Sequence, residues 1–526
     1  ALRERKRRWG KPLAVMVASL DEARALCEVD ADEADLLAGP VRPIVLLRRR
    51  ADTAPGAPAL ADSIAPRLRE VGVMLPYTPL HRLLIDAAGV PLVMTSGNLS
   101  DEPIATGNAE ALTRLAPIVD AVLSHDRGIR SRYDDSVVRV VDGRFESVRR
   151  ARGYAPFPLR LPHASDAHIL AAGPEQKNTF ALVRDDLAFV SQHVGDLENA
   201  DTLEAYESTL ALYERLFRIE PQLVAHDLHP EYLSTKFALG LGLPTVGVQH
   251  HHAHVASVLA EHAHEGRCVG IAFDGTGYGT DGRIWGGEVL LADLADFERF
   301  AHLREVPMPG GASAVRRPAR MAVGTLHALG LLDHPGAAPL LARLADGELE
   351  TLVRMADRGV NSPLTSSMGR LFDSVAAIAG VRDDALYEGQ AAIELEAAAD
   401  PGAHSAYAFA LVPGAATPLV IDPEPVLEAA LDDVARGVQS PVVSMRFHRA
   451  VADAVVRVAL AAADAAAAKE VAVCGGVFMN RILLGSSMAG LAEAGLTPLT
   501  HLRLPMNDAA VSFGQAAVAC ARRREI

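Results

Sequence analysis

The segment from His250 to Gly279 constrains the fold and the chemistry of this chain more than any other segment. It opens with His250, His251, His252 and His254. The run from His250 to His262 contains no helix breaker, so it is predicted to be helical. On such a helix His250 and His254 share one face, one turn apart, where two imidazoles can bind a single metal ion.

The next stretch predicts a strand that leads into a phosphate-binding turn. Cys268–Asp274 is apolar, ends in an acidic residue and continues as a glycine-rich turn up to Gly279. Such a turn brings backbone N–H groups close to a phosphate. A polar surface helix followed by an ordinary hairpin is the plainer alternative, but it leaves three consecutive histidines and a fourth unexplained. The favoured interpretation is a metal pair beside a phosphate loop, acting on a nucleotide or an activated phosphate.

Composition limits the class of protein. A chain of 526 residues has room for two to four domains, and its hydrophobic content of 49% suffices for large cores. No uninterrupted apolar run reaches membrane-spanning length, and the alanine-rich stretch 451–468 is predicted to be a buried helix of a soluble domain. The 4 cysteines are scattered without a C-x-x-C pair, which excludes a cysteine zinc site and a disulfide framework. A net charge of −15 disfavours nonspecific nucleic-acid binding. We therefore expect a cytoplasmic protein with no nucleic-acid and no membrane partner.

The chain is predicted to contain two α/β domains, residues 1–160 and 165–526. Strands are predicted at Pro12–Ala18, Ile44–Leu47, Leu92–Thr95, Ala121–Ser124 and Ser136–Val141, and helices at Glu22–Cys27, Leu80–Ala87 and Ala109–Leu115. The proline-rich segment Tyr154–Pro162 is the predicted linker, and a strand at His168–Ala172 opens the second domain. Neither half contains G-x-G-x-x-G before a helix or a Walker A motif, which disfavours the common dinucleotide and P-loop folds.

The first part carries a polar cluster of its own. Lys6 and Arg8 precede the first strand, and Ser96–Gly97–Asn98 follows the strand Leu92–Thr95, at the end of a strand where α/β sheets commonly bind ligands. Cationic side chains can hold a triphosphate, while serine and asparagine can hold its polar edges. Any one of these residues could be a solvated surface residue, but the set together predicts a nucleotide site.

The motifs of the first part resemble a known family. Lys6-x-Arg8 with Ser96-x-Asn98 is similar to the K-x-R and S-x-N signature of YrdC/Sua-type domains, which make carbamoyl-type adenylates from ATP. Three further segments resemble the HypF family, the carbamoyltransferases of [NiFe]-hydrogenase maturation: Tyr77–His81, Met94–Pro103 and Arg150–Pro156.

The second part resembles the same family over its whole length. The matching segments follow in family order: Pro174–Phe180, Ser191–Leu197, His226–Pro230, Gln249–His254, Asp274–Gly279, Trp285–Glu288, Gly369–Asp373, Tyr387–Gln390, Cys474–Asn480 and Asn507–Asp508. The resemblance implies an α/β fold class: a YrdC-like α/β domain followed by a two-lobed actin/Hsp70-like (ASKHA) domain of TsaD type.

The resemblance also implies the site residues. Carbamoyl-adenylate formation would use Lys6, Arg8, Ser96 and Asn98. Metal ligands, for one iron or zinc ion, would be His250, His254, Asp274 and Asp508. Nucleotide-binding residues would be Arg150, Lys177, Asn178, Gly275, Gly277, Gly279, Asp373, Glu388, Gly389, Gln390, Gly475, Gly476 and Asn480.

The implied activity is a relay between the two domains. The first would join carbamate, derived from carbamoyl phosphate, to ATP with Mg²⁺. The second would transfer the carbamoyl group to the C-terminal cysteine of the partner HypE. Two departures from the family bear on this expectation. Ala509–Ala510 stand where the family usually has two glycines, and the acylphosphatase-like and zinc-finger regions are not present before Lys6. We therefore expect a fragment or shortened form, incomplete at the start of its YrdC-like domain, that uses carbamoyl phosphate poorly by itself.

Three alternatives remain open. A tRNA threonylcarbamoyl transferase uses the same two folds, but the triple histidine, the family-specific segments and the acidic balance argue against it. A small-molecule O-carbamoyltransferase shares the chemistry, although its TsaD-like domain would come first in the chain. A non-catalytic nucleotide-binding scaffold of Hsp70 type would not need the histidine helix. Carbamoyl-dependent exchange of ATP with pyrophosphate, followed by identification of the labelled acceptor, separates them.

Overall fold

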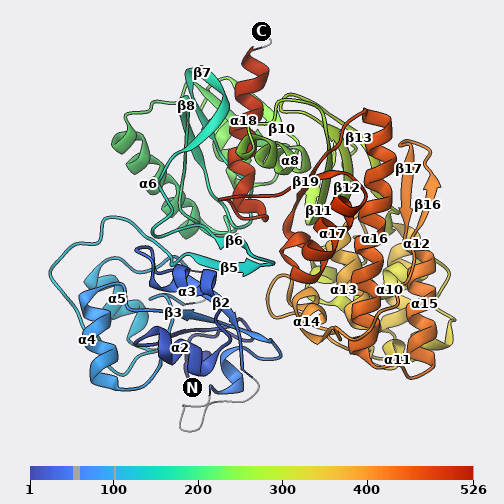
Figure 1. Cartoon of the computed structure of the whole chain (residues 1–526), viewed down its shortest axis with the longest axis horizontal. Coiled ribbons are helices and arrows are strands. Elements are labelled where there is room, and N and C mark those ends of the chain that lie inside the picture. Colours follow the sequence, from blue (N-terminus) through green and yellow to red (C-terminus); the bar gives the residue numbers. More distant parts are fainter. Residues whose placement is uncertain (51–59, 100–101, 525–526) are drawn as a thin grey trace. The chain divides into compact units, whose positions relative to one another are not determined.

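The computed structural model describes residues 1–50, 60–99 and 102–524. The chain groups into two compact units (Figure 1). The first unit comprises Ala1–Val246 and Leu502–Ala516, and the second comprises Gly247–His501 and Ala517–Ile526. Ser100 and Asp101, which belong to the predicted motif Met94–Pro103, lie outside the described residues.

The first sheet of the first unit has the strand order β4-β1-β3-β2-β5-β6. Its strands are β1 Ala14–Met16, β2 Ile44–Arg48, β3 Glu70–Met74, β4 Leu92–Met94, β5 Val137–Val141 and β6 Arg144–Arg149. The helices of this region are α1 Leu2–Arg5, α2 Leu20–Leu26, α3 Ala31–Ala38, α4 Pro79–Ala88 and α5 Asn108–Leu115. Alternating apolar side chains of β1, β2 and β3 build a buried core together with α2 and α3.

Local capping chemistry explains where these helices begin and end. The α2 helix starts at Ser19, whose side chain accepts from the backbone N–H of Glu22. Asp30 and Glu33 form a capping box at the start of α3. Proline at the first position opens α4, and Gly89 ends it with φ 62°, a left-handed conformation that favours glycine.

Most elements predicted for the first part are confirmed, and one is wrong. Helices lie where they were predicted, and strands occur at four of the five predicted places. The predicted strand Ala121–Ser124 is irregular, and its Leu123 side chain is 72% exposed. No described strand pairs with this segment. Apolar residues alone do not make a strand when no neighbour supplies the hydrogen-bonded ladder.

The second sheet of the first unit has the order β10-β9-β7-β8. Its strands are β7 Leu159–Ala171, β8 Ala181–Val190, β9 Leu223–Asp227 and β10 Thr245–Val248, and its helices are α6 Ala200–Phe217 and α7 Leu233–Gly240. The predicted linker Tyr154–Pro162 is therefore wrong in its second half, because β7 begins at Leu159. Pro162 is tolerated because the pairing of β7 with β8 is irregular between Arg160 and Ser165.

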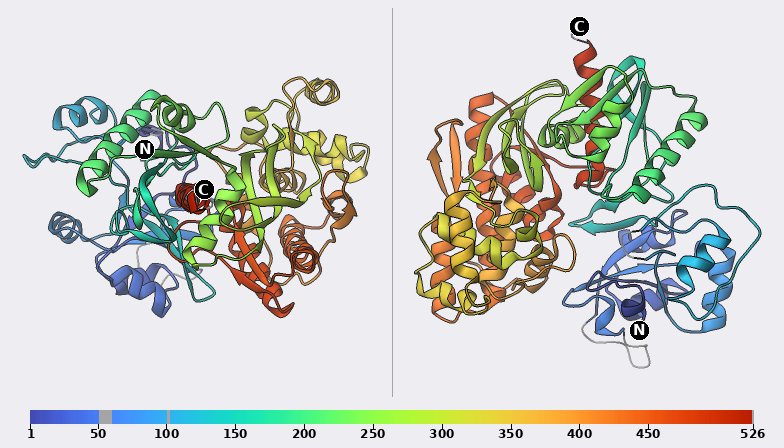
Figure 2. Two further views of the ribbon diagram at one scale, coloured as in Figure 1. Left: turned by 90° about the horizontal axis from the view of Figure 1, so that it is seen from above. Right: turned by 180° about the vertical axis from the view of Figure 1, so that it is seen from behind.

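The second unit is built on a nine-stranded sheet with the main order β16-β17-β13-β12-β11-β18-β19. These strands are β11 Cys268–Tyr278, β12 Ile284–Ala292, β13 Phe297–Leu303, β16 Ala410–Pro413, β17 Leu419–Asp422, β18 Glu470–Cys474 and β19 Thr497–Leu499. In addition, β15 Leu364–Thr365 pairs with β12, and β14 Val306–Pro307 pairs with β15. Its helices include α8 His250–Glu261, α10 Pro318–Ala328, α13 Met368–Ile378, α14 Gln390–Ala398, α15 Glu424–Ala435, α16 Ser440–Ala466 and α17 Arg481–Glu493. Figure 2 shows the strands of this sheet and its helices from two further sides. The α8 helix packs on β11, β12 and β18, while α13 and α16 also pack on β11 and β12.

The alternation of β11 decides where its acidic residue points. Gly270 lies so close to α8 that a Cβ there would collide with Val255. Successive side chains of a strand alternate between faces, so Asp274, four residues on, lies on the same face as Gly270. The predicted helix is confirmed as α8, which Gln249 caps through its side chain. Val255 directly follows His254, so the same packing directs Asp274 toward the histidines.

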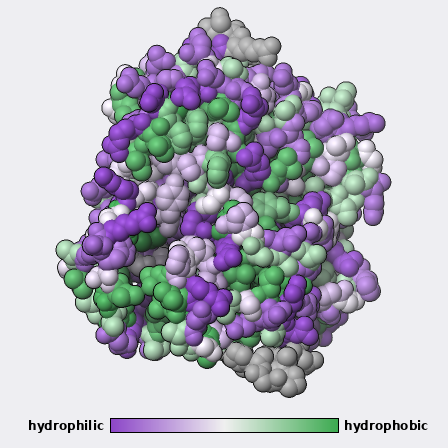
Figure 3. All heavy atoms as spheres, turned by 60° about the vertical axis from the view of Figure 1, so that its left-hand side comes forward, coloured by the Kyte–Doolittle hydropathy of each residue, from purple (hydrophilic) through white to green (hydrophobic). Residues whose placement is uncertain are grey.

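The alanine-rich stretch is confirmed as part of a long, largely buried helix, α16. Within the described part of the chain, no helix combines the length and apolar character needed to cross a membrane. On the face that Figure 3 presents, hydrophobic residues form patches separated by hydrophilic ones.

Candidate functional site

Two histidines and a carboxylate converge at one buried point of the second unit. The Nε2 atoms of His250 and His254 lie 3.3 Å and 3.6 Å from Asp274 Oδ2. The two imidazole rings are 5.0 Å apart between centroids, and all three side chains are buried. The i, i+4 spacing on α8 and the alternation of β11 together produce this arrangement.

The electrostatics of this cluster suit a cation. Burial by itself would raise the pKa of Asp274, but its contacts with His250 and His254 outweigh burial and hold the pKa well below its usual value. Asp274 Oδ1 accepts from the backbone N–H of Gly476 at 3.0 Å, which leaves Oδ2 facing the imidazoles. Two imidazoles and one carboxylate oxygen around a buried point match the ligand types of iron and zinc. The residues present therefore fit a metal ion.

Glycines of two segments border the cluster. The turn predicted directly after Asp274 begins later than predicted, because β11 continues to Tyr278 and pairs there with β12, with an irregular register between Phe273 and Gly277. We call the segment Gly275–Gly279 the glycine turn, because it leads into the hairpin turn that follows β11. Gly475 adopts φ 95°, and a Cβ there would collide with the carbonyl of Phe273. At Gly277 a Cβ would lie 2.5 Å from His251 Cε1 and 2.9 Å from His250 Cδ2. Only glycine fits these close approaches. Of the predicted phosphate-binding glycines Gly275, Gly277 and Gly279, Gly277 thus lies against the histidine helix, whereas Gly279 lies against Trp285.

Helix α13 is tied to the same turn. Ser367 caps α13 and donates its hydroxyl to the backbone carbonyls of Asp274 and Gly275, at 2.9 Å and 2.8 Å. Further along α13, Asp373 lies 2.9 Å from Arg370 in an ion pair with both side chains buried. Burial raises the pKa of Asp373 to about 6, although Arg370 opposes the shift. A carboxyl group with a raised pKa in such a place is a candidate functional group.

The other predicted nucleotide residues of this unit lie at the starts of two helices. Gly389 caps α14, Gln390 is buried and donates to Glu394 at 2.8 Å, and Glu388 is exposed. Asn480 caps α17 through the backbone N–H of Leu483, and its Nδ2 lies 2.7 Å from His448 Nε2. Their contact with a nucleotide stays a prediction.

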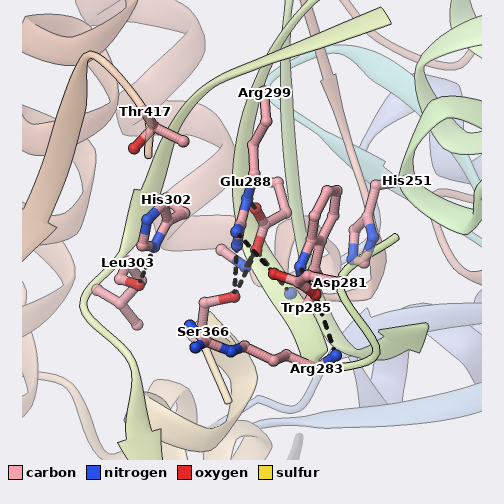
Figure 4. A network of polar contacts seen from close by, with 12 residues as sticks. His251, Asp281, Arg283, Trp285, Glu288, Arg299, His302, Leu303, Ser366 and Thr417 are labelled. Carbon is pink, nitrogen blue, oxygen red and sulfur yellow. Dashed lines mark hydrogen bonds and ion pairs between the residues drawn. The ribbon is translucent and has the colours of Figure 1, made fainter. Parts of the chain in front are cut away.

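The motif Trp285–Glu288 builds a polar network beside the glycine turn (Figure 4). Glu288 is fully buried, and it accepts from Ser366 Oγ at 2.6 Å and from Arg299 Nε at 2.6 Å. The Arg299 guanidinium lies 3.9 Å from the centre of the Trp285 ring, and Trp285 Nε1 donates to Asp281 at 3.0 Å. These donors compensate the burial of the carboxylate and fix the strand around it.

The first unit brings the predicted adenylation residues together. Lys6 Nζ donates to Thr95 Oγ1 at 3.0 Å and to the carbonyl of Ser96 at 2.6 Å. Ser96 Oγ donates to Asn98 Oδ1 at 2.6 Å, and Arg8 reaches Thr95 Oγ1 at 3.5 Å. Burial, aided by the nearby positive charge of Arg8, lowers the pKa of Lys6 to about 8.

Three more predicted residues of this unit take part in hydrogen bonds that involve the main chain. Arg150 is buried and donates to the carbonyls of Val190, Tyr154 and Phe157. Asn178 is buried and donates to the carbonyls of Ala172 and Pro174. The backbone N–H of Lys177 donates to Asp196 at 2.7 Å. These contacts hold the main chain, and the predicted nucleotide contacts of the three side chains are not tested by them.

A cavity of about 210 Å³ lies within the first unit. Asn98 and Arg132 line it together with Gln192 and His193. Gln192 donates to the carbonyl of Arg132 and accepts from the Tyr213 hydroxyl, which fixes one wall. The cavity therefore joins residues of the adenylation cluster to the predicted motif Ser191–Leu197.

Asp508 lies in the short helix η4 Asp508–Ala510, in the segment that groups with the first unit. Asn507 caps this helix and donates to the carbonyl of Val148 at 3.2 Å. Ala509 and Ala510 are buried, and the Ala509 carbonyl accepts from Thr179 at 2.9 Å. The role of Asp508 as a metal ligand stays a prediction.

The sequence missed several side chains that shape these sites. Thr95 was predicted only as the end of a strand, yet it bonds Lys6. Gln249, His251 and Ser367 hold or border the glycine turn, although no role was predicted for them. The threonine and serine are too common for a signal, but the position of Gln249 directly before the histidine run identifies it as a helix cap.

Family models match almost the whole chain. Residues 1–151 match the Sua5/YciO/YrdC family, described as telomere recombination. Residues 164–261 match the HypF Kae1-like domain, and residues 270–515 match the second subdomain of the Kae1-like domain of carbamoyltransferases. The chain is thus a protein that joins a YrdC-type domain to a Kae1-like domain.

Individual relatives agree. Carbamoyltransferase HypF2 of Cupriavidus necator is 43% identical over 99% of this chain and 69% of the relative. Carbamoyltransferase HypF of Rhodobacter capsulatus is 41% identical, with 99% and 68% covered. A crystal structure of full-length HypF in a phosphate- and nucleotide-bound form superposes with a TM-score of 0.95 at 41% identity, over 99% of this chain and 68% of that one. The chain belongs to the HypF carbamoyltransferase family, and it spans about two thirds of the length of these relatives.

Proposed function

We propose that this chain is an ATP-dependent carbamoyltransferase that forms carbamoyl-adenylate and passes the carbamoyl group to a protein thiol. The observation that carries the proposal is the buried convergence of His250, His254 and Asp274, in a chain of a carbamoyltransferase family. Family membership supports carbamoyl transfer, and the site geometry supports the assignment of residues.

The first step belongs to the adenylation cluster. A carbamate oxygen attacks the α-phosphorus of ATP. The bond from this phosphorus to the oxygen that bridges to the β-phosphate breaks, and pyrophosphate leaves. Lys6 and Arg8 would bind the triphosphate as its Mg²⁺ complex, and Ser96 with Asn98 would orient the reacting groups. The short contacts among Lys6, Thr95 and Ser96 support one shared site. Carbamoyl phosphate would supply the carbamate, and the product would leave through the cavity that Asn98 and His193 line.

The second step belongs to the histidine cluster. His250, His254 and Asp274 would hold one iron or zinc ion, and we propose Asp508 as the fourth ligand. Such an ion supplies Lewis acidity that polarises a carbonyl group. The glycines of the two turns would hold the phosphate, while Lys177, Asn178, Asp373, Gln390 and Asn480 would orient the nucleotide; the same role is proposed for Arg150, Glu388 and Gly389.

The acceptor thiol must come from another protein. All four cysteines of this chain are buried, and burial raises the pKa of each thiol, which disfavours the reactive thiolate. We therefore propose that the acceptor is the C-terminal cysteine of HypE, in [NiFe]-hydrogenase maturation. Its thiolate attacks the carbamoyl carbon of carbamoyl-adenylate, the bond from this carbon to the phosphate oxygen breaks, and AMP leaves. The net charge of −15 is unfavourable for the tRNA alternative.

Radiolabelled exchange tests both steps. With carbamate and Mg²⁺, the chain should exchange pyrophosphate into ATP, and labelled carbamoyl should then appear on HypE. A matched HypE variant with its terminal cysteine changed to serine should stay unlabelled. Label on tRNA or on a small hydroxyl compound would replace this proposal by the corresponding alternative, and absence of exchange would exclude the adenylation step.

A further inference from the structure

We propose that His251 is a ligand-binding residue whose Nε2–H donates a hydrogen bond to an anionic phosphate oxygen held at the glycine turn Gly275–Gly279. The inference rests on the proposed function only in taking this turn as the phosphate site. It adds a third histidine, beyond His250 and His254, with a role distinct from metal binding.

Position is the first argument. His251 is completely buried, and its ring lies 5.4 Å from the His250 ring between centroids. Its Cε1 atom, which lies between the two ring nitrogens, is the nearest atom to the space where a Gly277 side chain would be, at 2.5 Å. The edge of the imidazole thus borders the backbone of the glycine turn.

The tautomer is the second argument. Gln249 Oε1 accepts from the backbone N–H of His252 at 2.9 Å, so the Gln249 amide presents its N–H₂ group elsewhere. That group donates to the carbonyl of Tyr278 at 3.1 Å and lies 3.2 Å from His251 Nδ1. Because the amide nitrogen is only a donor, Nδ1 must be the acceptor. The proton of the neutral ring is therefore on Nε2.

The third argument is that this donor is not used within the protein. Among the described residues, His251 Nε2 is buried and has no hydrogen-bond partner. A buried donor left without an acceptor is unfavourable, and native proteins seldom retain one without a reason. The neighbouring His252 differs, since its Nε2 lies 2.8 Å from the carbonyl of Asp293. A bound phosphate oxygen would satisfy the His251 donor.

The surroundings hold the ring in place. Trp285 lies beside His251, with 6.2 Å between the ring centroids, and the Arg299 guanidinium stacks on the Trp285 ring (Figure 4). The buried Glu288 anchors Arg299 in turn. A donor fixed by packing and by Gln249 loses little entropy when it binds a ligand.

Binding of ADP, measured by calorimetry without any carbamoyl substrate, tests the proposal. His251→Phe keeps a ring but removes the donor, and it should weaken ADP binding roughly tenfold to a hundredfold. His251→Gln places an amide N–H near the former Nε2 position and should restore much of the affinity, whereas His251→Asn, which imitates only Nδ1, should not. Gln249→Glu should also weaken ADP binding, because a carboxylate at this place draws the proton to Nδ1.

The matched control is His252→Asn, a change of an equally buried histidine on the same helix, which should leave ADP affinity within about twofold. Circular dichroism checks that each variant is folded, and the comparison of His251→Gln with His251→Asn remains decisive if His251→Phe fails to fold. Equal ADP affinity of His251→Gln, His251→Asn and the unchanged chain would overturn the inference. Failure of the proposed function would appear differently, as normal ADP binding without carbamoyl transfer by the unchanged chain.

Discussion

The adenylation cluster and the histidine cluster differ in how deeply their polar side chains are buried and in what these side chains contact. In the first, Lys6, Thr95, Ser96 and Asn98 satisfy one another through hydrogen bonds, and Ser96 and Asn98 are only half-buried. In the second, His250, His254 and Asp274 are buried on a helix and a central strand, and the Asp274 carboxylate faces two imidazoles.

The two sites differ in the contacts that their polar groups make. In the adenylation cluster the polar groups hydrogen-bond one another, so a nucleotide that binds them would compete with internal hydrogen bonds. The histidine cluster gathers ligand atoms at one buried point, and a cation there would compensate a carboxylate held away from water. Loss of side chains should therefore impair the orientation of reactants at the first cluster and abolish metal binding at the second, while the fold stays intact. Four predictions test this contrast.

The largest effect is expected at the histidine cluster. His250→Ala with His254→Ala removes both imidazole ligands, so bound metal should fall from about one ion per chain to almost none. Elemental analysis by mass spectrometry measures this content after dialysis. His252→Ala on the same helix is the control and should keep its metal. Unchanged metal in the double variant would remove the proposed site.

The next effect concerns catalysis at the adenylation cluster. Ser96→Ala with Asn98→Ala should lower pyrophosphate exchange by roughly 100-fold or more, because two groups that orient the reactants are lost. The melting temperature should change little, since both side chains are half-buried. ADP binding by the second unit serves as the control and should persist. Full exchange by this variant would contradict the assignment of these residues.

Glycine substitutions beside the two sites should also differ in their effect on the free energy of unfolding. Gly475→Ala forces a Cβ onto the Phe273 carbonyl at a positive φ, and it should lower the free energy of unfolding by about 1–3 kcal/mol. Gly97→Ala, beside the adenylation cluster, meets only Leu115 at 3.6 Å and should cost less than about 1 kcal/mol. Gly495 has φ 81° and open surroundings, so Gly495→Ala measures the loss of stability that comes from backbone conformation alone. Denaturant titration measures all three, and equal losses at Gly475 and Gly97 would break the contrast.

The smallest effect is a pH dependence. The pKa of Lys6 is lowered to about 8, so its positive charge is lost above that pH. The kcat/KM for ATP in the exchange reaction should fall by about tenfold per pH unit above this value. Lys6→Arg stays charged and should flatten the profile. Stability should move the opposite way: the unfolded chain binds this proton more tightly, so folding gains stability as pH rises from about 8 toward 10.5. A flat profile for the unchanged chain would contradict the role of Lys6.

Local sequence patterns predict much of the site. The i, i+4 spacing of His250 and His254, with the cap before it, is enough to predict α8 and a shared face. The apolar run before Asp274 is enough to predict the strand, although not its continuation to Tyr278. The strand predicted at Ala121–Ser124 failed because composition does not reveal whether a partner strand is available.

Local sequence motifs predict the family, the order of the two domains, and the residue types that carry the chemistry, because motifs and short periodicities are local in the chain. The contact of Asp274 with His250 and His254 depends on tertiary packing, because the packing of Val255 on Gly270 sets which face of β11 points to α8. The orientation of Gln249 beside His251 depends on it as well, because the Gln249 amide donates to Tyr278, 29 residues away in the chain. Contacts between distant segments depend on packing, and no local pattern in the chain encodes them.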